Sequence, residues 1–165
     1  MTIIKYPEKI LRQKTTPIEK ITKEIFDLSE TMIQTMLEND GIGLAANQIG
    51  SLHKLFVLNL KPFEDKPEPI VVINPRIIKT EENHEDEEGC LSFPGLYLHI
   101  PRFKRTVLHY QSLYNEKFVI ETDGLVSRAI QHEYDHLNGI LFIDYVNKNE
   151  KEKLDQYLSN LKTEQ

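Results

Sequence analysis

The sequence predicts an α+β fold in which antiparallel or mixed β-sheets pack around a central helix, with a further helix toward each end of the chain. Three observations lead to this prediction. Segments typical of strands outnumber segments typical of helices, the two kinds do not alternate regularly, and no internal repeat or linker divides the 165 residues. A chain of this length is most simply one domain with its own core, so we predict a single domain over residues 1–165.

The N-terminal part of the chain predicts one helix between two irregular stretches. Residues 2–6 are strand-like, and Thr22 is placed as the N-cap of a helix that runs to about Glu38, with the capping box Thr16–Glu19 as an alternative, earlier start. One apolar stripe supports this helix, made of Ile25, Leu28, Met32, Ile33, Met36 and Leu37. The stretch 41–50 is rich in glycine and alanine, and we expect it to form a tightly packed turn from helix to strand.

The middle of the chain predicts several strands. The segments rich in β-branched and aliphatic residues are 54–60, 70–79, 96–100, 105–113 and 116–121. Residues 61–69 contain three prolines and are expected to form an exposed loop. Residues 81–88 carry six carboxylates, which predicts a solvated acidic loop rather than a metal site. Tyr114 and Asn115 are placed as a hairpin turn.

Residues 131–139 contain the pattern His-Glu-x-x-His, around which the rest of the chain can be organised. On an α-helix this spacing places His132 and His136 on one face, one turn apart, so both can bind a single metal ion. Glu133, beside the first histidine, can then act as general base toward a metal-bound water. The bare pattern also occurs by chance on amphipathic helices, so its meaning depends on the residues elsewhere.

The C-terminal part of the chain contains two segments with helical periodicity. Asp123 is expected to cap the helix that carries the motif, and Gly139 falls where a glycine ends such a helix. From about Lys148 to Lys162 a second amphipathic helix is expected. Its apolar face consists of Leu154, Tyr157, Leu158 and Leu161.

A catalytic metal needs about three protein ligands and an open position, so a third ligand must come from outside the motif. The candidates are Cys90, Asp135, His99, His109 and the acidic segment 81–88. Cys90 is the only thiol in the chain. Three interpretations of Cys90 remain open from chemistry alone: a metal ligand, a small buried apolar residue, or a nucleophile paired with His132.

The composition argues against several classes of protein. A net charge of −6 supplies no basic surplus for neutralising phosphates, so we expect no direct nucleic-acid reader. A single cysteine cannot form an internal disulfide. We find neither a signal-peptide pattern nor an apolar run approaching the ~20 residues of a membrane span. We therefore expect a cytoplasmic protein that does not enter a membrane.

Three separated motifs resemble those of peptide deformylases. They are GIGLAANQ (41–48), EGCLS (88–92) and QHEYDHLNG (131–139), and their order and spacing also fit that family. The resemblance extends over nearly the whole chain, and the helical tail is similar to the bacterial and organellar type that ends in a helix. It implies hydrolysis of the N-formyl group from the N-terminal formyl-methionine of newly synthesised polypeptides, with release of formate.

The resemblance also implies the metal centre. Carried over by motif, the ligands are Cys90, His132 and His136. The cofactor implied is one Fe2+ per chain, with Ni2+, Co2+ or Zn2+ able to substitute. A thiolate and two imidazoles leave a metal dication with a net charge near +1 and a position for water.

Roles in catalysis follow from the same motifs. The resemblance implies that Glu133 is the general acid/base for attack by metal-bound water on the formyl carbon. It implies that Gln48 and the backbone N–H of Leu91 stabilise the oxyanion. The substrate-binding residues implied are Ile42, Gly43, Gly89, Leu125 and Ala129, with His132 as a further pocket wall. Gly43 belongs to the edge expected to pair with an extended peptide.

The implied partners are nascent formyl-Met polypeptides, with a transient ribosome contact as a further expectation, and we expect a monomer.

The sequence departs from the family pattern in places. Tyr97 stands near the place where some relatives carry a substrate-contacting arginine, which makes Arg102 and Arg105 alternatives for that contact. Asp86 and Arg128 stand where some relatives have apolar residues near the pocket.

Overall fold

An antiparallel sheet in the order β1-β2-β3-β4-β5 forms the framework of the computed structural model, which describes residues 1–163. The strands are β1 (Gly43–Ala45), β2 (Leu55–Asn59), β3 (Pro69–Cys90), β4 (Phe93–Gln111) and β5 (Lys117–Asp123). Each strand pairs with the strand that precedes it in the chain, so the sheet is a simple meander without crossovers. Residues 164 and 165 lie outside the described part of the predicted domain.

The helices lie where the sequence predicts them. They are α1 (Lys23–Glu38), α2 (Gly124–Leu137) and α3 (Lys151–Thr163), with shorter 3-10 helices η1 (Lys9–Arg12), η2 (Ala46–Ile49) and η3 (Phe142–Tyr145). Thr22 and Asp123 are the N-cap residues of α1 and α2, and Gly139, just beyond the end of α2, has a φ of +71°. The α+β class is therefore confirmed. No helix within residues 1–163 is long and apolar enough to cross a membrane.

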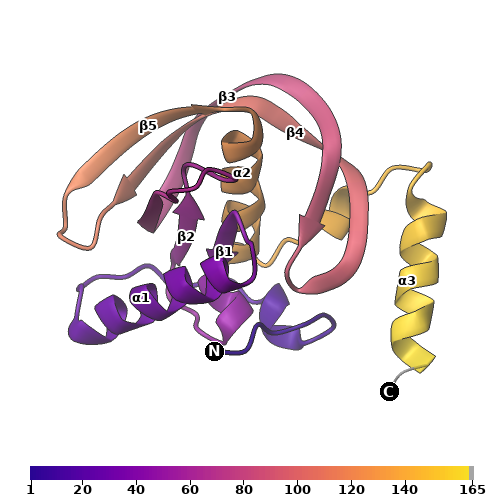
Figure 1. The fold of residues 1–165 in the computed structure, drawn as a ribbon, viewed down its shortest axis with the longest axis horizontal. Helices are drawn as coiled ribbons and strands as arrows, with labels where there is room; N and C mark the ends of the chain where they lie inside the picture. Colours follow the sequence, from indigo (N-terminus) through magenta and orange to yellow (C-terminus); the bar gives the residue numbers. More distant parts are fainter. Residues whose placement is uncertain (164–165) are drawn as a thin grey trace.

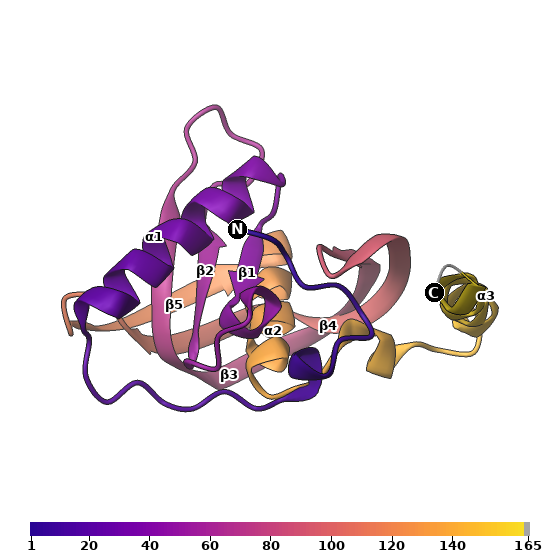
Figure 2. The ribbon, with the colours of Figure 1, turned by 90° about the horizontal axis from the view of Figure 1, so that it is seen from below.

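Strand β2 connects the cores on the two faces of the sheet. All five of its residues are buried, and alternate side chains point to opposite faces. Leu55 and Val57 pack into the core beneath α1, while Phe56 and Leu58 pack into the core that includes Ile130 of α2. The sheet is therefore covered by a helix on each face at this point. Figures 1 and 2 show α2 running through the middle of the molecule between β1, β2 and the long curved strands β3 and β4.

Residues 81–88 do not form the acidic loop that we predicted. They continue β3 and, except for Glu82, pair with residues of β4, so that Glu81 lies opposite Arg105 and Glu87 opposite His99. Cross-strand ion pairs such as Glu81–Arg105 offset the repulsion among the carboxylates. For the same reason the two strands predicted over 96–100 and 105–113 are parts of the single strand β4.

The first residues do not form the predicted strand. Within 2–6, the N–H of Ile4 donates to the carbonyl of Gln48 and the N–H of Tyr6 donates to the carbonyl of Ser92. These two bonds reach different segments, so no ladder forms. They nevertheless tie the N-terminus to η2 and to the turn that follows Cys90.

Helix α3 docks at the edge of the molecule, beyond β4 (Figures 1 and 2). Leu154 is buried, and Tyr157 and Leu158 pack against the same apolar cluster, which includes Phe93 and Phe142. Three of the four residues of the predicted apolar face, Leu154, Tyr157 and Leu158, therefore form the docking face of the helix.

An ion pair joins the N-terminal and C-terminal segments. We expect it to contribute to the loss of folding stability at acid pH. Arg12 of η1 donates two hydrogen bonds to Asp144 of η3, at 2.5 and 2.9 Å. Burial acts to raise the pKa of Asp144, but Arg12 outweighs it and the pKa is lowered. A lowered folded-state pKa contributes stability above the unfolded pKa of about 3.9, and this contribution is lost as the pH falls through the folded value.

Asp144→Asn should therefore make the free energy of unfolding less dependent on pH below about pH 5. Urea titrations at several pH values between neutrality and acid would measure this. Asp155→Asn, which removes an exposed carboxylate from α3, is the matched control. Equal pH dependence in wild type and Asp144→Asn would contradict the expectation.

Candidate active site and metal centre

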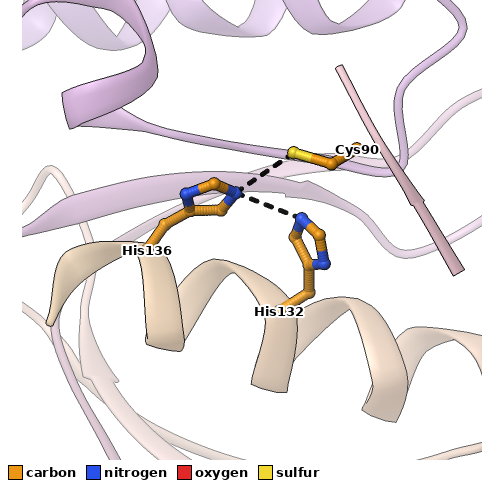
Figure 3. A group of neighbouring side chains, drawn as sticks. All are labelled: Cys90, His132 and His136. Carbon is orange, nitrogen blue, oxygen red and sulfur yellow. Dashed lines mark hydrogen bonds between the residues drawn. The ribbon is translucent and has the colours of Figure 1, made fainter. Parts of the chain in front are cut away.

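One end of β3 and one face of α2 bring three metal-binding side chains together. Cys90 is the last residue of β3, and His132 and His136 lie on successive turns of α2. Their ligand atoms all lie within 4.8 Å of one another, the only such group of three or more among residues 1–163. Figure 3 shows both imidazoles and the sulfur directed toward a common point.

The spacing of these atoms fits a divalent metal. Tetrahedral coordination with metal–nitrogen and metal–sulfur bonds of the usual lengths separates two nitrogens by about 3.3 Å and a sulfur and a nitrogen by about 3.6 Å. The Nε2 atoms of His132 and His136 are 3.1 Å apart, and Cys90 Sγ lies 3.4 Å from His136 Nε2. The donor set therefore fits a metal of the zinc or iron type, with a position left for a further ligand.

A buried ionic network holds the first histidine. Glu88 accepts a hydrogen bond from His132 Nδ1 at 3.0 Å, which leaves Nε2 directed toward Cys90 and His136. Arg102 donates to both oxygens of Glu88, at 3.1 and 2.8 Å, and to Asp135 at 2.6 Å. Arg128 donates a further bond to Glu88 at 3.3 Å. The orientation of His132 therefore depends on Glu88 and on the two arginines that bind this carboxylate.

Burial and neighbouring charges set the ionisation of these groups. Burial acts to raise the pKa of Glu88, but His132 and Arg102 lower it well below its ordinary range, so Glu88 is a carboxylate. Burial acts to lower the pKa of His132, but Glu88 and Cys90 raise it well above its ordinary value, so a metal would displace a proton there. Burial lowers the pKa of His136, which favours the neutral imidazole that a metal requires.

Glu133 has the properties of a general acid/base. Burial raises its pKa to about 7, so the side chain can take up and release a proton near neutrality. Its Oε2 atom is buried without a hydrogen-bond partner among the described residues. Gly43 makes room for it, because a Cβ at that position would lie 2.6 Å from Glu133 Cγ. Residues 1–163 provide no partner for this oxygen.

Gln48 is held in one orientation beside the thiol. Its Oε1 accepts the N–H of Ala45 at 2.9 Å, which identifies Nε2 as the atom on the other side. Nε2 donates to Ser92 Oγ at 3.1 Å and to Cys90 Sγ at 3.6 Å. The side-chain amide therefore presents a donor at the edge of the candidate metal centre.

A cleft of about 630 Å³ opens over this centre. The predicted site residues that line it are Ile42, Gly43, Gln48, Gly89, Cys90, Leu91, Leu125, Ala129, His132 and Glu133. His136 is the one predicted residue that does not line it, since it is buried at the base of the site. The structure thus brings together residues that the sequence separates by more than ninety positions, while their individual roles remain predictions.

The three alternatives for a substrate-contacting side chain lie in different places. Tyr97 lines the cleft, with its ring against Gly89. Arg102 is buried in the ionic network, and Arg105 pairs with Glu81 at the solvent-exposed surface of the sheet. Of these three, only Tyr97 is placed to contact a molecule in the cleft.

Sequence reasoning missed the network around Glu88. Asp135 directly precedes the expected ligand His136, and Glu88 lies two residues before the expected ligand Cys90. This closeness in the sequence is a local signal that could have indicated both residues. Arg102 carried no such signal, because it lies fourteen positions from Glu88 and reaches it only through the pairing of β3 with β4.

Loss of Arg102 should be strongly destabilising. The side chains of Arg102 and Glu88 are 4% and 5% exposed, so Arg102→Met leaves buried carboxylates without their main partner. Breaking such a pair costs about 3–5 kcal/mol of the free energy of unfolding. Urea unfolding of metal-loaded protein would measure this loss.

Arg105→Met is the matched control, because it removes a half-exposed arginine from ion pairs at the surface. Surface pairs contribute only about 0–1 kcal/mol. Similar losses in the two variants would show that the buried network does not carry the stability assigned to it.

Comparisons with known proteins agree with the site. The family model described as polypeptide deformylase matches residues 1–152. The peptide deformylase of Helicobacter hepaticus is 36% identical, with 99% of this chain and 93% of that protein covered. That of Rhizobium meliloti is 41% identical, with 88% and 84% covered.

Solved structures give the same result. Arabidopsis thaliana peptide deformylase 1B, in complex with an inhibitor, superposes with a TM-score of 0.93 at 34% identity, covering 99% of this chain and 91% of that one. A peptide deformylase from Legionella pneumophila superposes with a TM-score of 0.89 at 33% identity, covering 98% and 95%. The chain therefore belongs to the peptide deformylase family, metal-dependent hydrolases that remove the N-formyl group from nascent peptides.

Proposed function

We propose that this chain hydrolyses the N-formyl group of the N-terminal formyl-methionine of new polypeptides and releases formate. The observation that carries the proposal is the convergence of Cys90, His132 and His136 in a cleft beside the unpaired carboxylate oxygen of Glu133. We further infer that residues 1–165 form a single catalytic domain, because the cleft is built from both the N-terminal and the C-terminal halves of the sequence.

Cys90, His132 and His136 would hold one metal ion, which we propose to be Fe2+, with Ni2+, Co2+ or Zn2+ as substitutes. A thiolate with two imidazoles suits these ions better than Mg2+ or Ca2+, which prefer oxygen ligands. When bound, such a metal lowers the pKa of a coordinated water and polarises the substrate carbonyl.

Glu133 is the proton carrier in this mechanism. Its free Oε2 accepts a proton from the water as the water oxygen attacks the formyl carbon. When the carbon–nitrogen bond breaks, Glu133 returns the proton to the departing amine, so the products are formate and a free N-terminus. A pKa of about 7 suits both halves of this exchange.

Gln48 and Leu91 would stabilise the charge that develops on the formyl oxygen. The amide of Gln48 is fixed by Ala45 with Nε2 toward the centre, and Leu91 follows Cys90 directly on the wall of the cleft. A preorganised donor of this kind typically contributes about 3 kcal/mol to the transition state.

The cleft also supports a position for the peptide. β1 is an edge strand, hydrogen-bonded to β2 on one side only, so an extended peptide can add to it near Gly43. Gly89 borders the same cleft on the opposite strand, β3. The methionine side chain would lie among Ile42, Leu125 and Ala129, with His132 at the inner end. Main-chain pairing gives little preference for the residues that follow, as processing of many different polypeptides requires.

We also infer that the protein acts in the cytoplasm as a monomer that meets nascent formyl-Met polypeptides as they leave the ribosome. Lysines 151, 153 and 162 of α3 are exposed and support a transient ribosome contact. Co-sedimentation with ribosomes should then weaken when these lysines are replaced by glutamine. Unchanged co-sedimentation would remove α3 from the contact.

The experiment that tests the proposed function is formate release from formyl-Met-Ala-Ser by protein purified without oxygen, together with its metal content. Turnover with one metal per chain supports the proposal. Metal without turnover contradicts it. Cleavage of an unformylated internal peptide bond would instead indicate an endopeptidase. A Ni2+-reconstituted sample distinguishes a misassigned centre from one lost to oxidation.

A further inference from the structure

A buried arginine lies in the wall of the cleft where the methionine side chain would be placed. Arg128 is 6% exposed and lines the cleft together with Leu125 and Ala129. It lies one helical turn before His132 on α2, so its side chain is on the stripe that also carries the candidate ligand. An apolar lining would be sufficient for methionine, so the presence of a cation here calls for an explanation.

The guanidinium of Arg128 is fixed by the sheet opposite. Nη1 donates to the carbonyl of Ile100 at 2.8 Å and to Glu88 at 3.3 Å, and Nη2 donates to the carbonyl of His84 at 2.9 Å. Glu88 and His84 belong to β3, and Ile100 belongs to β4. The side chain therefore spans the space between α2 and the two long strands, held by three acceptors.

A second cavity lies on the other side of this side chain. It has a volume of about 80 Å³, and Leu125 and Arg128 are the two residues that line both it and the main cleft. The rest of its lining is His84, Asp86, Phe103, Lys104 and Gly124. Its volume is roughly that of two or three water molecules, enough for a short extension of an alkyl chain. Leu125 and Arg128 therefore form a partition, and Arg128 is its buried part.

We propose that Arg128 sets the length of the N-terminal side chain that this enzyme accepts. It closes the side-chain pocket at a depth suited to methionine and separates the pocket from the second cavity. A longer straight chain would have to displace the guanidinium and leave two buried carbonyls and Glu88 short of donors. This specificity role rests on the proposed deformylase function and assigns the substrate class to unbranched side chains no longer than that of methionine.

The test compares two formyl peptides on metal-loaded enzyme, formyl-Met-Ala-Ser and formyl-2-aminooctanoyl-Ala-Ser, whose side chain is two atoms longer. In Arg128→Ala the partition is opened, so the ratio of kcat/KM for the longer to the shorter substrate should rise about tenfold or more. Arg128→Met keeps an unbranched side chain that follows the first part of the same path but lacks the guanidinium and its charge, so its ratio should rise less than that of Arg128→Ala.

Leu125→Ala opens the same partition without touching Glu88, and it should raise the ratio in the same direction. This second variant keeps the test decisive if Arg128→Ala unfolds, which its Tm would show. A parallel fall in kcat/KM for both substrates would overturn the proposal, because it indicates a purely structural role for Arg128. An equal rise of the ratio in Arg128→Met and Arg128→Ala would also overturn it, because it indicates an effect of charge.

Failure of the proposed function is a separate outcome. In that case wild-type enzyme with bound metal would release no formate from either peptide, and no ratio could be formed. Rapid hydrolysis of formyl-Met-Ala-Ser with unchanged ratios in the Arg128→Ala and Leu125→Ala variants would leave the deformylase function intact and remove only the assignment of Arg128.

Discussion

Glu133→Gln is expected to retain metal and fold while kcat/KM for formyl-Met-Ala-Ser falls by about 10²–10⁴. Glutamine has nearly the same shape as glutamate, so the tight contact with Gly43 is kept. It cannot accept the proton of the attacking water, however, and cannot return it to the amine. Because Glu133 is 4% exposed and burial already raises its pKa, removing its charge should cost little stability.

Three measurements on Glu133→Gln separate catalysis from structure: formate release, metal per chain and Tm. Glu152→Gln, which alters an exposed carboxylate on α3, is the control for a general effect of charge. Appreciable turnover in Glu133→Gln would remove Glu133 from the acid/base role. Loss of metal together with turnover would place the residue among the groups that hold the metal instead.

The elements that the sequence predicts well are those governed by local pattern. The apolar stripe of 22–38 and the caps of the helix over 124–137 depend on residues within a few turns of one another, and both helices are found with these ends. Asn115 lies in the predicted hairpin turn with a φ of +62°, a conformation that asparagine adopts readily.

The elements that the sequence predicts poorly are governed by distant partners. Residues 81–88 form a strand because β4 pairs with them and supplies Arg105 opposite Glu81, twenty-four positions away. Local composition, with its run of carboxylates, favours a loop and contains no information about that partner. The same limitation hid the pairing of Arg102 with Glu88.

The candidate metal centre combines residues that local pattern predicts with one whose role depends on distant partners. His132, Glu133 and His136 are predicted by spacing within one helix, and chemistry alone left Cys90 with three interpretations. The structure places Cys90 at the end of β3, with Sγ 3.4 Å from His136 Nε2. This position favours a metal ligand over a buried apolar residue, since the thiol faces two imidazoles and the amide of Gln48.

Cys90→Ala is therefore expected to lose most of its bound metal, and with it formate release, while the fold is retained. Two imidazoles alone bind a divalent ion far more weakly than two imidazoles with a thiolate, because the anionic ligand is lost. The fold should persist because Cys90 is small and only half-buried, so little packing is lost. Metal analysis after dialysis, formate release and Tm measure the three expectations.

Cys90→Asp tests the reason for that loss. It restores a negative charge but offers oxygen in place of sulfur, a harder donor that shifts preference away from thiophilic ions. We expect this variant to bind metal again, with a changed ratio of Fe2+ to Zn2+ when both are supplied. Unchanged metal content in Cys90→Ala would exclude Cys90 as a ligand. If wild-type activity then survived chelation but not thiol alkylation, the nucleophile interpretation of Cys90 would replace it, with His132 as the paired base.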